Sequence, residues 1–457
     1  MDQRHKDGGF SRNKTKKKNK NMDDQQQDYN TNWQQTYGGN FSGFGANIPS
    51  KRNKTTGAPF PESGATFQST PFQCIRIVKD LTFGKNVKNK NFVFSPCSIQ
   101  LALSLLANGA KGSTLDEFLK FLEVEDRSNL NSVAREFFNK LSGSGTKGGQ
   151  ALSCVSGVWV DNSLPLNPTF VTVAESIYHG KAEVVDFKNE VKANEVLAEV
   201  NKWAEEATGG LIKSVLPRGS FNPLTRIVLG NALYFKGKWA QEFVKSGTKH
   251  FKFYLPDGKS IEAPFMTNSE KQFVRTFDGF KVLRLPYKKS THKNAASLSM
   301  YIILPDEIDG LLHLTEMVCS DPLFIKKYVH DSYQPQVRMG RFWVPKFEIT
   351  HDFEASKVLQ DAGIKLRFSS QAEFDDLLLN PGGHLKISQV VHKSCIKVDE
   401  EGTEAAAVTM VMLMAKCARR PPPPVNFVAD HPFMFMIRDD ASGMVLFMGH
   451  VVNPLLK

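Results

Sequence analysis

The sequence predicts a mixed α+β fold for residues 70–457, and three observations lead to it. Several apolar runs have the length of a strand and end at turn signals, which is typical of strands buried on both faces. Other segments carry apolar residues at helical spacing. The two kinds of segment follow one another irregularly, without the regular alternation of strand and helix that a doubly wound parallel sheet requires.

Two helices are expected near the start of this region. Residues 73–81 carry apolar side chains at helical spacing. Residues 98–107 form an apolar run that is opened by the segment FSPCS. Pro96 suits the first turn of a helix, and the hydroxyl of Ser98 can accept a backbone hydrogen bond there, so Ser98 is the expected N-cap.

Four strands can be placed from their apolar runs. Residues 225–235 (TRIVLGNALYF) and 298–304 (LSMYIIL) end at Lys-Gly and Pro-Asp turns and are expected to be central strands. Residues 433–437 (FMFMI) and 445–448 flank the segment RDDASG. An Asp/Gly turn between two apolar runs predicts a β-hairpin.

Residues 1–69 differ in composition from everything after them. They are rich in Asn, Gln, Gly, Ser and Lys and have almost no aliphatic side chains. Such a segment cannot bury enough apolar area to offset its conformational entropy, so we expect it to be disordered. Eleven Lys and Arg against six Asp and Glu give it +5 of the net charge of +11. The run KTKKKNK at 14–20 fits a nuclear-import or phosphate-binding signal, or simply a solvated basic tail.

Several classes of protein are disfavoured by what the sequence lacks. The six cysteines show no CxxC pair and no zinc-like spacing with histidine, which argues against a disulfide scaffold or a zinc module. The first 30 residues are polar, and no run of 18 apolar residues occurs, so neither a cleavable secretory signal nor a membrane span is expected. No GxSxG, HExxH or similar signature indicates an enzyme, a metal site or a cofactor.

Residues 399–424 (DEEGTEAAAVTMVMLMAKCARRPPPP) do not behave like the rest of the chain. A connection of this length is unusual in a compact domain. If the segment is extended, one face holds small or aliphatic residues, namely Thr403, Ala405, Ala407, Thr409, Val411 and Leu413. The segment ends in basic residues and four prolines, which bar a central strand. A segment that can form a strand and that leads to a basic tip suggests an exposed loop. Such a loop could act as bait and then move to another position in the protein.

The sequence resembles the serpin family, and most closely its plant intracellular members. Nine blocks in the same order carry the resemblance across 70–457: FSPCSI (94–99), GAKGST (109–114), NKWAEEATGGLI (201–212), NALYFKGKW (231–239), APFM (263–266), VPKF (344–347), VHKSCIKVDEEGTEAAA (391–407), FVADHPFMFMIRD (427–439) and GMVLFMGHVVNP (443–454). The resemblance implies the serpin fold, with three β-sheets, eight or nine helices and an exposed reactive-centre loop at about 400–424.

The resemblance implies a suicide inhibitor and not an enzyme. A target protease attacks the loop and forms its acyl-enzyme, and the freed loop then inserts as a new strand into the largest sheet and distorts the protease. The alternative is a non-inhibitory member of the family, a storage or binding protein whose loop is only a substrate.

In the serpin family, the position of the reactive bond can be counted from a hinge glycine. In inhibitory members the hinge glycine lies fourteen residues before the residue that donates the scissile carbonyl, which leads here from Gly402 to Lys416. The expected bond is Lys416–Cys417, with bonds after Arg419 or Arg420 as alternatives. A lysine there fits a protease with an acidic specificity pocket, so the expected partner is trypsin-like, papain-like or metacaspase-like.

Two further groups of residues are assigned by resemblance. The hinge comprises Glu400, Glu401, Gly402, Thr403, Glu404, Ala405, Ala406 and Ala407. The shutter, a structural hydrogen-bonded gate beneath the sheet that opens, comprises Ser95, Ser98, Asn231 and His392. Plant members commonly have Asn where Ser156 stands and a larger residue where Gly230 stands, and both departures are expected to lower stability.

The remaining expectations concern the setting in which the protein works. We expect a monomer in the cytoplasm, the nucleus or both, since no secretory signal is seen. No membrane contact is expected. Nucleic acid could be bound only through the basic residues of the N-terminal tail.

Overall fold

The computed structural model describes residues 70–84, 90–142, 150–207, 210, 212–216, 219–289, 295–329, 335–365, 372–379, 387–403 and 422–456. The predicted tail, 1–69, lies outside these ranges. In the described ranges, no helix is both long enough and apolar enough to span a membrane.

Eight α-helices are present in the described residues. They are α1 (Phe72–Phe83), α2 (Pro96–Gly109), α3 (Gly112–Phe121), α4 (Arg127–Ser142), α5 (Pro168–Ser176), α6 (Glu190–Ala207), α7 (Leu311–Ser320) and α8 (Ser356–Asp361). The two predicted helices are confirmed as α1 and α2. The predicted cap of α2 was wrong, because the N-cap is Ser95, whose Oγ accepts a hydrogen bond from the backbone N–H of Ser98 at 3.0 Å. Pro96 occupies the first turn as expected.

The strands of the described residues form three sheets, which confirms the predicted α+β class. The first, which we call the large sheet, has the order β11 (Phe347–Glu354), β12 (Gln389–Val398), β4 (Ile227–Lys238), β2 (Gln150–Asp161) and β3 (Lys181–Val185), with the short β13 (Gly402–Thr403) also paired to β4. The second has the order β1 (Phe92–Phe94), β16 (Val445–Val451), β15 (Phe433–Asp439), β9 (Leu298–Pro305), β8 (Phe280–Pro286) and β7 (Phe273–Phe277). The third has the order β14 (Val425–Val428), β10 (Met339–Pro345), β6 (Ser260–Met266) and β5 (Lys249–Tyr254).

All four predicted strands are present. The run 225–235 lies largely in β4, where every residue from Ile227 to Phe235 is buried, and 298–304 lies in the fully buried β9. The predicted hairpin is formed by β15 and β16, which pair antiparallel. Gly443 in its turn has φ +82°, a left-handed conformation that glycine adopts without strain.

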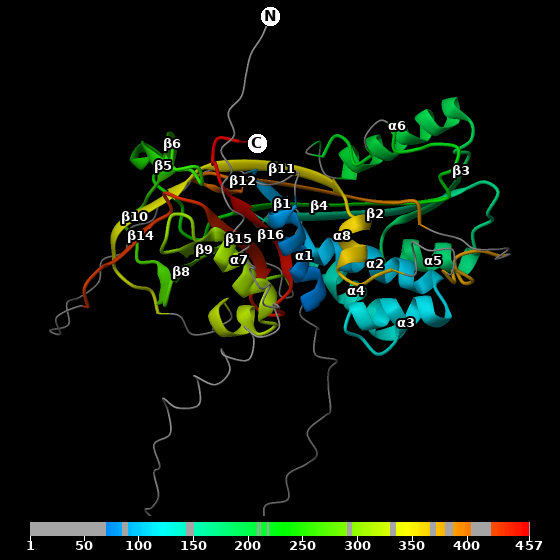
Figure 1. Cartoon of the computed structure of the whole chain (residues 1–457), viewed down its shortest axis with the longest axis horizontal. Helices are drawn as coiled ribbons and strands as arrows, with labels where there is room; N and C mark the ends of the chain where they lie inside the picture. The colour runs from blue at the N-terminus through cyan, green and yellow to red at the C-terminus, as the bar shows by residue number, and fades with distance from the viewer. Residues whose placement is uncertain are drawn as a thin grey trace, which may run out of the picture. The chain divides into compact units, whose positions relative to one another are not determined.

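The two faces of the large sheet are covered differently. Figure 1 shows α6 on one face and α2, α4 and α5 on the other. On the α6 face, the ring of Trp203 meets that of Trp159 edge to face, with centroids 6.2 Å apart. The opposite face of the sheet joins the main core, which continues into the second and third sheets.

Trp159 also explains one departure from the family pattern. A β-carbon at Gly230 would lie 2.8 Å from the Trp159 ring, and one at Gly157 would collide with the same ring. The indole thus occupies the space that a larger residue before Asn231 would need. Gly230 leaves no void to be filled, so the expected loss of stability has no basis in the packing here.

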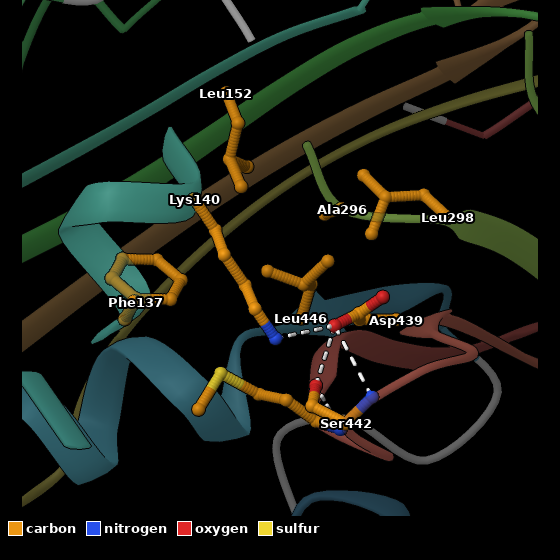
Figure 2. Close-up of a pocket in the computed structure, with 9 residues that line it drawn as sticks. Phe137, Lys140, Leu152, Ala296, Leu298, Asp439, Ser442 and Leu446 are labelled. Carbon is orange, nitrogen blue, oxygen red and sulfur yellow. Dashed lines mark hydrogen bonds and ion pairs between the residues drawn. The ribbon is translucent and has the colours of Figure 1, made fainter. Parts of the chain in front are cut away.

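The end of α4 is fixed to the β15–β16 hairpin by a buried charge (Figure 2). Lys140 Nζ lies 3.3 Å from Oδ2 of Asp439, a buried side chain. The same carboxylate accepts a hydrogen bond from Ser442 Oγ at 2.6 Å. A cavity of about 20 Å³ remains between them, which is large enough for a single water molecule.

Candidate functional site

The candidate site begins where the chain leaves the large sheet and turns back on itself. After β12, the backbone N–H of Asp399 donates to the carbonyl of Gly402 at 3.0 Å and closes a tight turn. Gly402 then pairs antiparallel with Lys238 of β4, and Thr403 with Gly237. Gly402 has φ +143°, and a β-carbon there would collide with the carbonyl oxygen of Gly237. Only glycine can make this close approach.

Strands β12 and β4 run parallel, and their ladder is incomplete. Register pairs extend from Gln389–Val228 to Cys395–Tyr234. Beyond that point β12 continues beside β11, with which it pairs antiparallel. The last residues of β4 are paired with β13 instead. At this end of the large sheet, β4 and β12 are therefore no longer paired with each other. The turn 399–402 lies between them.

Trp239 anchors the turn to the end of β4. Its backbone N–H donates to the carbonyl of Glu401 at 3.0 Å, and its indole Nε1–H donates to the carbonyl of Asp399 at 2.9 Å. The indole is buried and stacks on Tyr287 with centroids 4.5 Å apart. Two hydrogen bonds from one rigid residue hold both ends of the turn in place.

Glu400 is a buried carboxylate with two partners. Oε1 accepts from Thr248 Oγ at 2.7 Å, and Oε2 pairs with Lys346 Nζ at 2.8 Å. Burial alone would raise the pKa of Glu400, but the hydrogen bonds from Lys346 and Thr248 outweigh it and hold the pKa below its usual range. Its carbonyl also accepts from the N–H of Phe243 at 2.8 Å. Glu400 is therefore ionised and fixed.

The other two acidic residues of the turn are held less completely. Glu401 is buried and forms an ion pair with Lys245, whose side chain is 64% exposed. Its Oε2 has no hydrogen-bond partner among the described residues. Burial raises the pKa of Asp399, against the attraction of Lys397 and Lys346. Three carboxylates thus crowd one turn, and their charge is offset by Lys245 after β4, Lys346 between β10 and β11, and Lys397 of β12.

A second cluster bridges the same two strands in the middle of the sheet. His392 of β12 and Asn231 of β4 are register partners, and His392 Nδ1 lies 3.0 Å from Asn231 Oδ1. The backbone N–H of Ser95, at the start of α2, donates to His392 Nε2 at 3.0 Å. Ser98 Oγ donates to Asn231 Oδ1, and the Asn231 amide donates to the carbonyl of Ser98 at 3.1 Å. The four residues predicted by resemblance therefore lie together, all buried.

The hydrogen bonds fix the protonation state of His392. Since Nε2 accepts from a backbone N–H, the proton of the neutral ring is on Nδ1 and is donated to Asn231. Burial, and to a smaller extent the nearby His351, lower the pKa of His392 to about 3. The contact between β12 and β4 is therefore a neutral hydrogen bond at all pH values above that.

Sequence reasoning missed two members of this cluster. Ser394 Oγ lies 2.9 Å from His392 Nε2, and Ser156 Oγ accepts from the Asn231 amide at 3.0 Å. Ser394 could have been found, since it lies two residues from His392 on the same face of a strand. Ser156 requires the register of β2 against β4, which places it opposite Asn231. The serine keeps a hydrogen bond at the position where plant members commonly have Asn.

We use the name shutter cluster for Ser95, Ser98, Ser156, Asn231, His392 and Ser394. The remaining predicted site residues lie outside the described residues: Glu404, Ala405, Ala406, Ala407, Lys416, Cys417, Arg419 and Arg420. Of Thr403 only the backbone pairing is described. Among the described residues, no group of His, Cys, Asp and Glu is arranged to hold a metal ion.

Comparisons with known proteins show which family the chain is similar to. Residues 73–454 match the family model described as Serpin (serine protease inhibitor). The chain is 42% identical to Serpin-Z1C of Triticum aestivum over 84% of this chain and 95% of the relative, and 45% identical to Serpin-ZXA of Oryza sativa subsp. japonica over 80% and 91%. The structure is similar to that of Arabidopsis AtSerpin1 in its native stressed conformation, with a TM-score of 0.77 and 37% identity, covering 86% of this chain and all of the other.

Proposed function

The chain belongs to the serpin family and has the serpin fold, and on that premise we propose that it is an irreversible, suicide inhibitor of a serine or cysteine endopeptidase that cleaves after Lys or Arg. The protease cleaves the segment that follows the hinge and forms an acyl-enzyme with it. The freed segment then enters the large sheet between β4 and β12 and carries the protease with it. The inhibitor is consumed in the process, so it is not an enzyme.

The observation that carries this proposal is the register of β13. Gly402 pairs with Lys238 and Thr403 with Gly237. If that register continued, residue 406 would come opposite Tyr234 and residue 412 opposite Val228. These two residues of β4 bound the stretch that β12 now occupies. A strand that entered in this register would replace one parallel pairing by two antiparallel pairings, which are more stable per residue.

The same register decides which way the inserted side chains would point. Ile227, Leu229, Leu233 and Phe235 of β4 belong to the main core, whereas alternate residues face α6. Register partners on neighbouring strands share a face. The residues that would enter the main core are Ala405, Ala407, Thr409, Val411 and Leu413. All of them are small or aliphatic, as insertion into a closely packed core requires.

The length of the segment fits transfer of a bound protease across the sheet. Lys416 follows Gly402 by fourteen residues, which corresponds to about 46 Å in an extended strand. In the register of β13, residue 413 would lie opposite Ile227, where β4 begins. Lys416 would then be past the opposite end of β4, and a protease joined to it would be pulled against that end.

Insertion requires the shutter cluster to open. The bond between His392 and Asn231 crosses the interface between β12 and β4. We assign the shutter cluster the role of the gate, and residues 400–407 the role of the hinge at which insertion starts. Of the hinge, Glu400, Glu401, Gly402 and Thr403 lie in the described residues. Neither group touches the protease, so both act on the rate and not on the choice of target.

The choice of target rests on Lys416–Cys417, with Arg419 and Arg420 as alternative sites of cleavage. A lysine or arginine fits a pocket that carries an acidic group. The proposed partners are trypsin-like, papain-like or metacaspase-like proteases.

The decisive experiment mixes the full chain with bovine trypsin. We expect a complex of the summed mass that survives SDS, and mass spectrometry should find the cleaved bond after Lys416. The variant Lys416→Ala should lose the complex, whereas Arg419→Ala should keep it. Cleavage without a complex would support the alternative, a non-inhibitory serpin-fold protein whose loop is only a substrate.

The setting of the protein is proposed separately. We propose that residues 70–457 are the inhibitor domain, that 1–69 form a basic extension, and that the protein acts as a monomer in the cytoplasm, the nucleus or both. Contact with nucleic acid would then involve only the extension. Salt-dependent binding to a random DNA duplex should disappear when residues 1–69 are deleted. Binding that persists in the shortened protein would contradict this assignment.

A further inference from the structure

The turn that leads into β4 presents an apolar side chain to solvent. Leu224 is 82% exposed, the highest value for a large apolar side chain in the part of the chain that the structure describes. Pro223, beside it, is also exposed. A single exposed leucine is ordinary on a protein surface. Leu224 is distinguished by its place relative to the segment that would enter the large sheet.

Hydrogen bonds hold this turn in one shape. The backbone N–H of Thr225 donates to the carbonyl of Asn222 at 2.9 Å, and the N–H of Leu224 donates to Asn222 Oδ1 at 2.9 Å. The N–H of Asn222 donates to Oγ1 of the buried Thr225 at 2.9 Å. The guanidinium of Arg226 donates to the carbonyls of Pro223 and Thr225. The backbone at Leu224 is therefore fixed, and its side chain stays exposed.

The turn lies at the far end of the interface between β4 and β12. Ser388, which precedes β12, donates its backbone N–H to the carbonyl of Ile227 at 2.9 Å, and its Oγ accepts from the N–H of Arg226 at 2.9 Å. The pairing of the two strands begins at the next residues, Val228 and Gln389. A strand that entered this interface from the hinge would therefore leave it beside the turn.

The register of β13 brings one residue of the entering segment level with Leu224. Strands β13 and β4 run antiparallel, and Gly402 is the partner of Lys238. In an antiparallel register, each step forward from Gly402 is matched by one step back from Lys238. Lys416 follows Gly402 by fourteen residues, and Leu224 precedes Lys238 by fourteen. The residue that would carry the acyl bond to the protease thus comes level with the most exposed apolar side chain.

An apolar side chain at this place has a defined effect on a trapped protease. The complex is lost when water attacks the carbonyl carbon of the acyl bond. That step leaves a carboxylate on Lys416 and returns a proton to the serine or cysteine of the protease. An apolar group packed beside the bond excludes water from it and gains from its own burial only while the complex lasts. Both effects slow the release of the protease.

We propose that Leu224 is a positioning residue of the trapped complex, whose side chain packs against the apolar rim of the protease active site beside the acyl bond. This role rests on the proposed function and adds to it the contact that determines how long the protease stays trapped. The twelve residues of β4, about 40 Å of strand, separate Leu224 from the hinge. The first attack of the protease on the loop should therefore not depend on Leu224.

The test follows the release of active trypsin from the SDS-resistant complex of the full chain. Complexes of the natural protein and of Leu224→Ser are freed of unreacted bovine trypsin, and the return of trypsin activity is recorded. We expect the Leu224→Ser complex to release trypsin about fivefold faster, as the lost burial of part of a leucine side chain predicts. The rate constant for complex formation and the urea midpoint of the free protein should be unchanged, because Leu224 is exposed before insertion.

Two further variants are the controls. Leu312→Ser removes a side chain that is 50% exposed in α7, away from this turn, and should release trypsin as slowly as the natural protein. Leu224→Met keeps an apolar side chain of similar size and should also keep the natural rate.

The outcomes separate this role from the proposed function. If a complex forms and Leu224→Ser releases trypsin at the natural rate, or if Leu312→Ser accelerates release equally, the role of Leu224 is overturned and the inhibitory function stands. If the natural chain forms no SDS-resistant complex, the inhibitory function fails, and the role of Leu224 fails with it.

Discussion

The hinge and the shutter cluster both lie where β4 meets β12, and their side chains are held by different chemistry. The hinge uses charge: Glu400 and Glu401 are held by Lys346 and Lys245, whose side chains are 35% and 64% exposed. The shutter cluster uses neutral hydrogen bonds, and its residues are all buried. Ion pairs that reach solvent can be exchanged for water at small cost, whereas a neutral network in the core cannot. We therefore expect the shutter cluster to set the barrier to opening and the hinge to set where insertion starts.

The largest effect should come from Asn231→Ala. The Asn231 side chain makes hydrogen bonds with His392, Ser98 and Ser156, and its loss leaves several buried groups without partners. We expect the free energy of unfolding in urea to fall by about 3–4 kcal/mol. Hydrogen exchange of the β12 amides should accelerate strongly, because the strand loses its side-chain bond to β4.

Asn91→Ala is the matched control. Asn91 is also buried, and its side chain makes four hydrogen bonds, to Asn453, Leu456 and Val452, all away from the large sheet. Asn91→Ala should lower the free energy of unfolding to a similar extent. The hydrogen exchange of the β12 amides should then be no faster than the change in global unfolding alone predicts. Equal acceleration of β12 in both variants would contradict a gating role for the shutter cluster.

The next effect should come from Gly402→Ala. The new methyl group would collide with the carbonyl of Gly237 and force β13 away from β4. We expect the turn to open locally at a cost of about 2–3 kcal/mol, seen as rapid amide exchange at Gly402's neighbours.

Gly279→Ala separates collision from backbone strain. Gly279 also has a positive φ, +82°, but open space surrounds its missing β-carbon. This control should show only the smaller cost of strain. If both substitutions leave the turn 399–403 equally protected, the close approach of Gly402 to β4 does not hold the hinge.

The dependence on pH should distinguish the two regions. An unfolded histidine binds a proton below about pH 6.5, whereas His392 with a folded pKa of about 3 does not. Its contribution to stability is complete above pH 6.5 and falls with decreasing pH by up to about 1.4 kcal/mol per unit, or about 2 kcal/mol by pH 5. The lowered pKa of Glu400 has the same sign, but its contribution is lost only below about pH 4.5.

Urea midpoints measured between pH 6.5 and pH 5 test this difference. His392→Gln should flatten the slope, whereas Glu400→Gln should lower the curve and keep its slope. A slope in the His392 variant as steep as in the natural protein would show that other groups, such as His351 and His450, account for it.

The smallest effects should come from the hinge ion pairs. Glu400→Gln should cost about 1 kcal/mol, and Glu401→Gln less, because Lys245 is more exposed than Lys346 and its attraction is more screened. The double variant Glu400→Lys with Lys346→Glu exchanges the two charges, so it should recover part of the stability that Glu400→Gln loses. Double-mutant cycles in low and high salt would measure both pairs. A larger loss for Glu401 would reverse this ranking of the two pairs.

The regular elements were predictable, because long apolar runs are governed by local periodicity. The N-cap of α2 was not, because Ser95 and Ser98 both suit that position, and contact with Asn231, more than 130 residues away, gives Ser98 another partner. The hinge carboxylates could be identified by resemblance. Their lysine partners could not, since Lys245 and Lys346 come from distant segments whose register no local pattern encodes.

The most direct test of the central claim, that β4 and β12 must separate for a protease to be trapped, is a reversible lock between them. The natural cysteine Cys395, which is in no disulfide among the described residues, is the register partner of Tyr234. The substitution Tyr234→Cys in a Cys417→Ser background therefore places two cysteines within disulfide range. After the disulfide is verified by mass, trypsin should cleave the oxidised protein without forming an SDS-resistant complex. The same protein after reduction should form the complex. Equal complex formation by the oxidised and reduced forms would contradict insertion between β4 and β12.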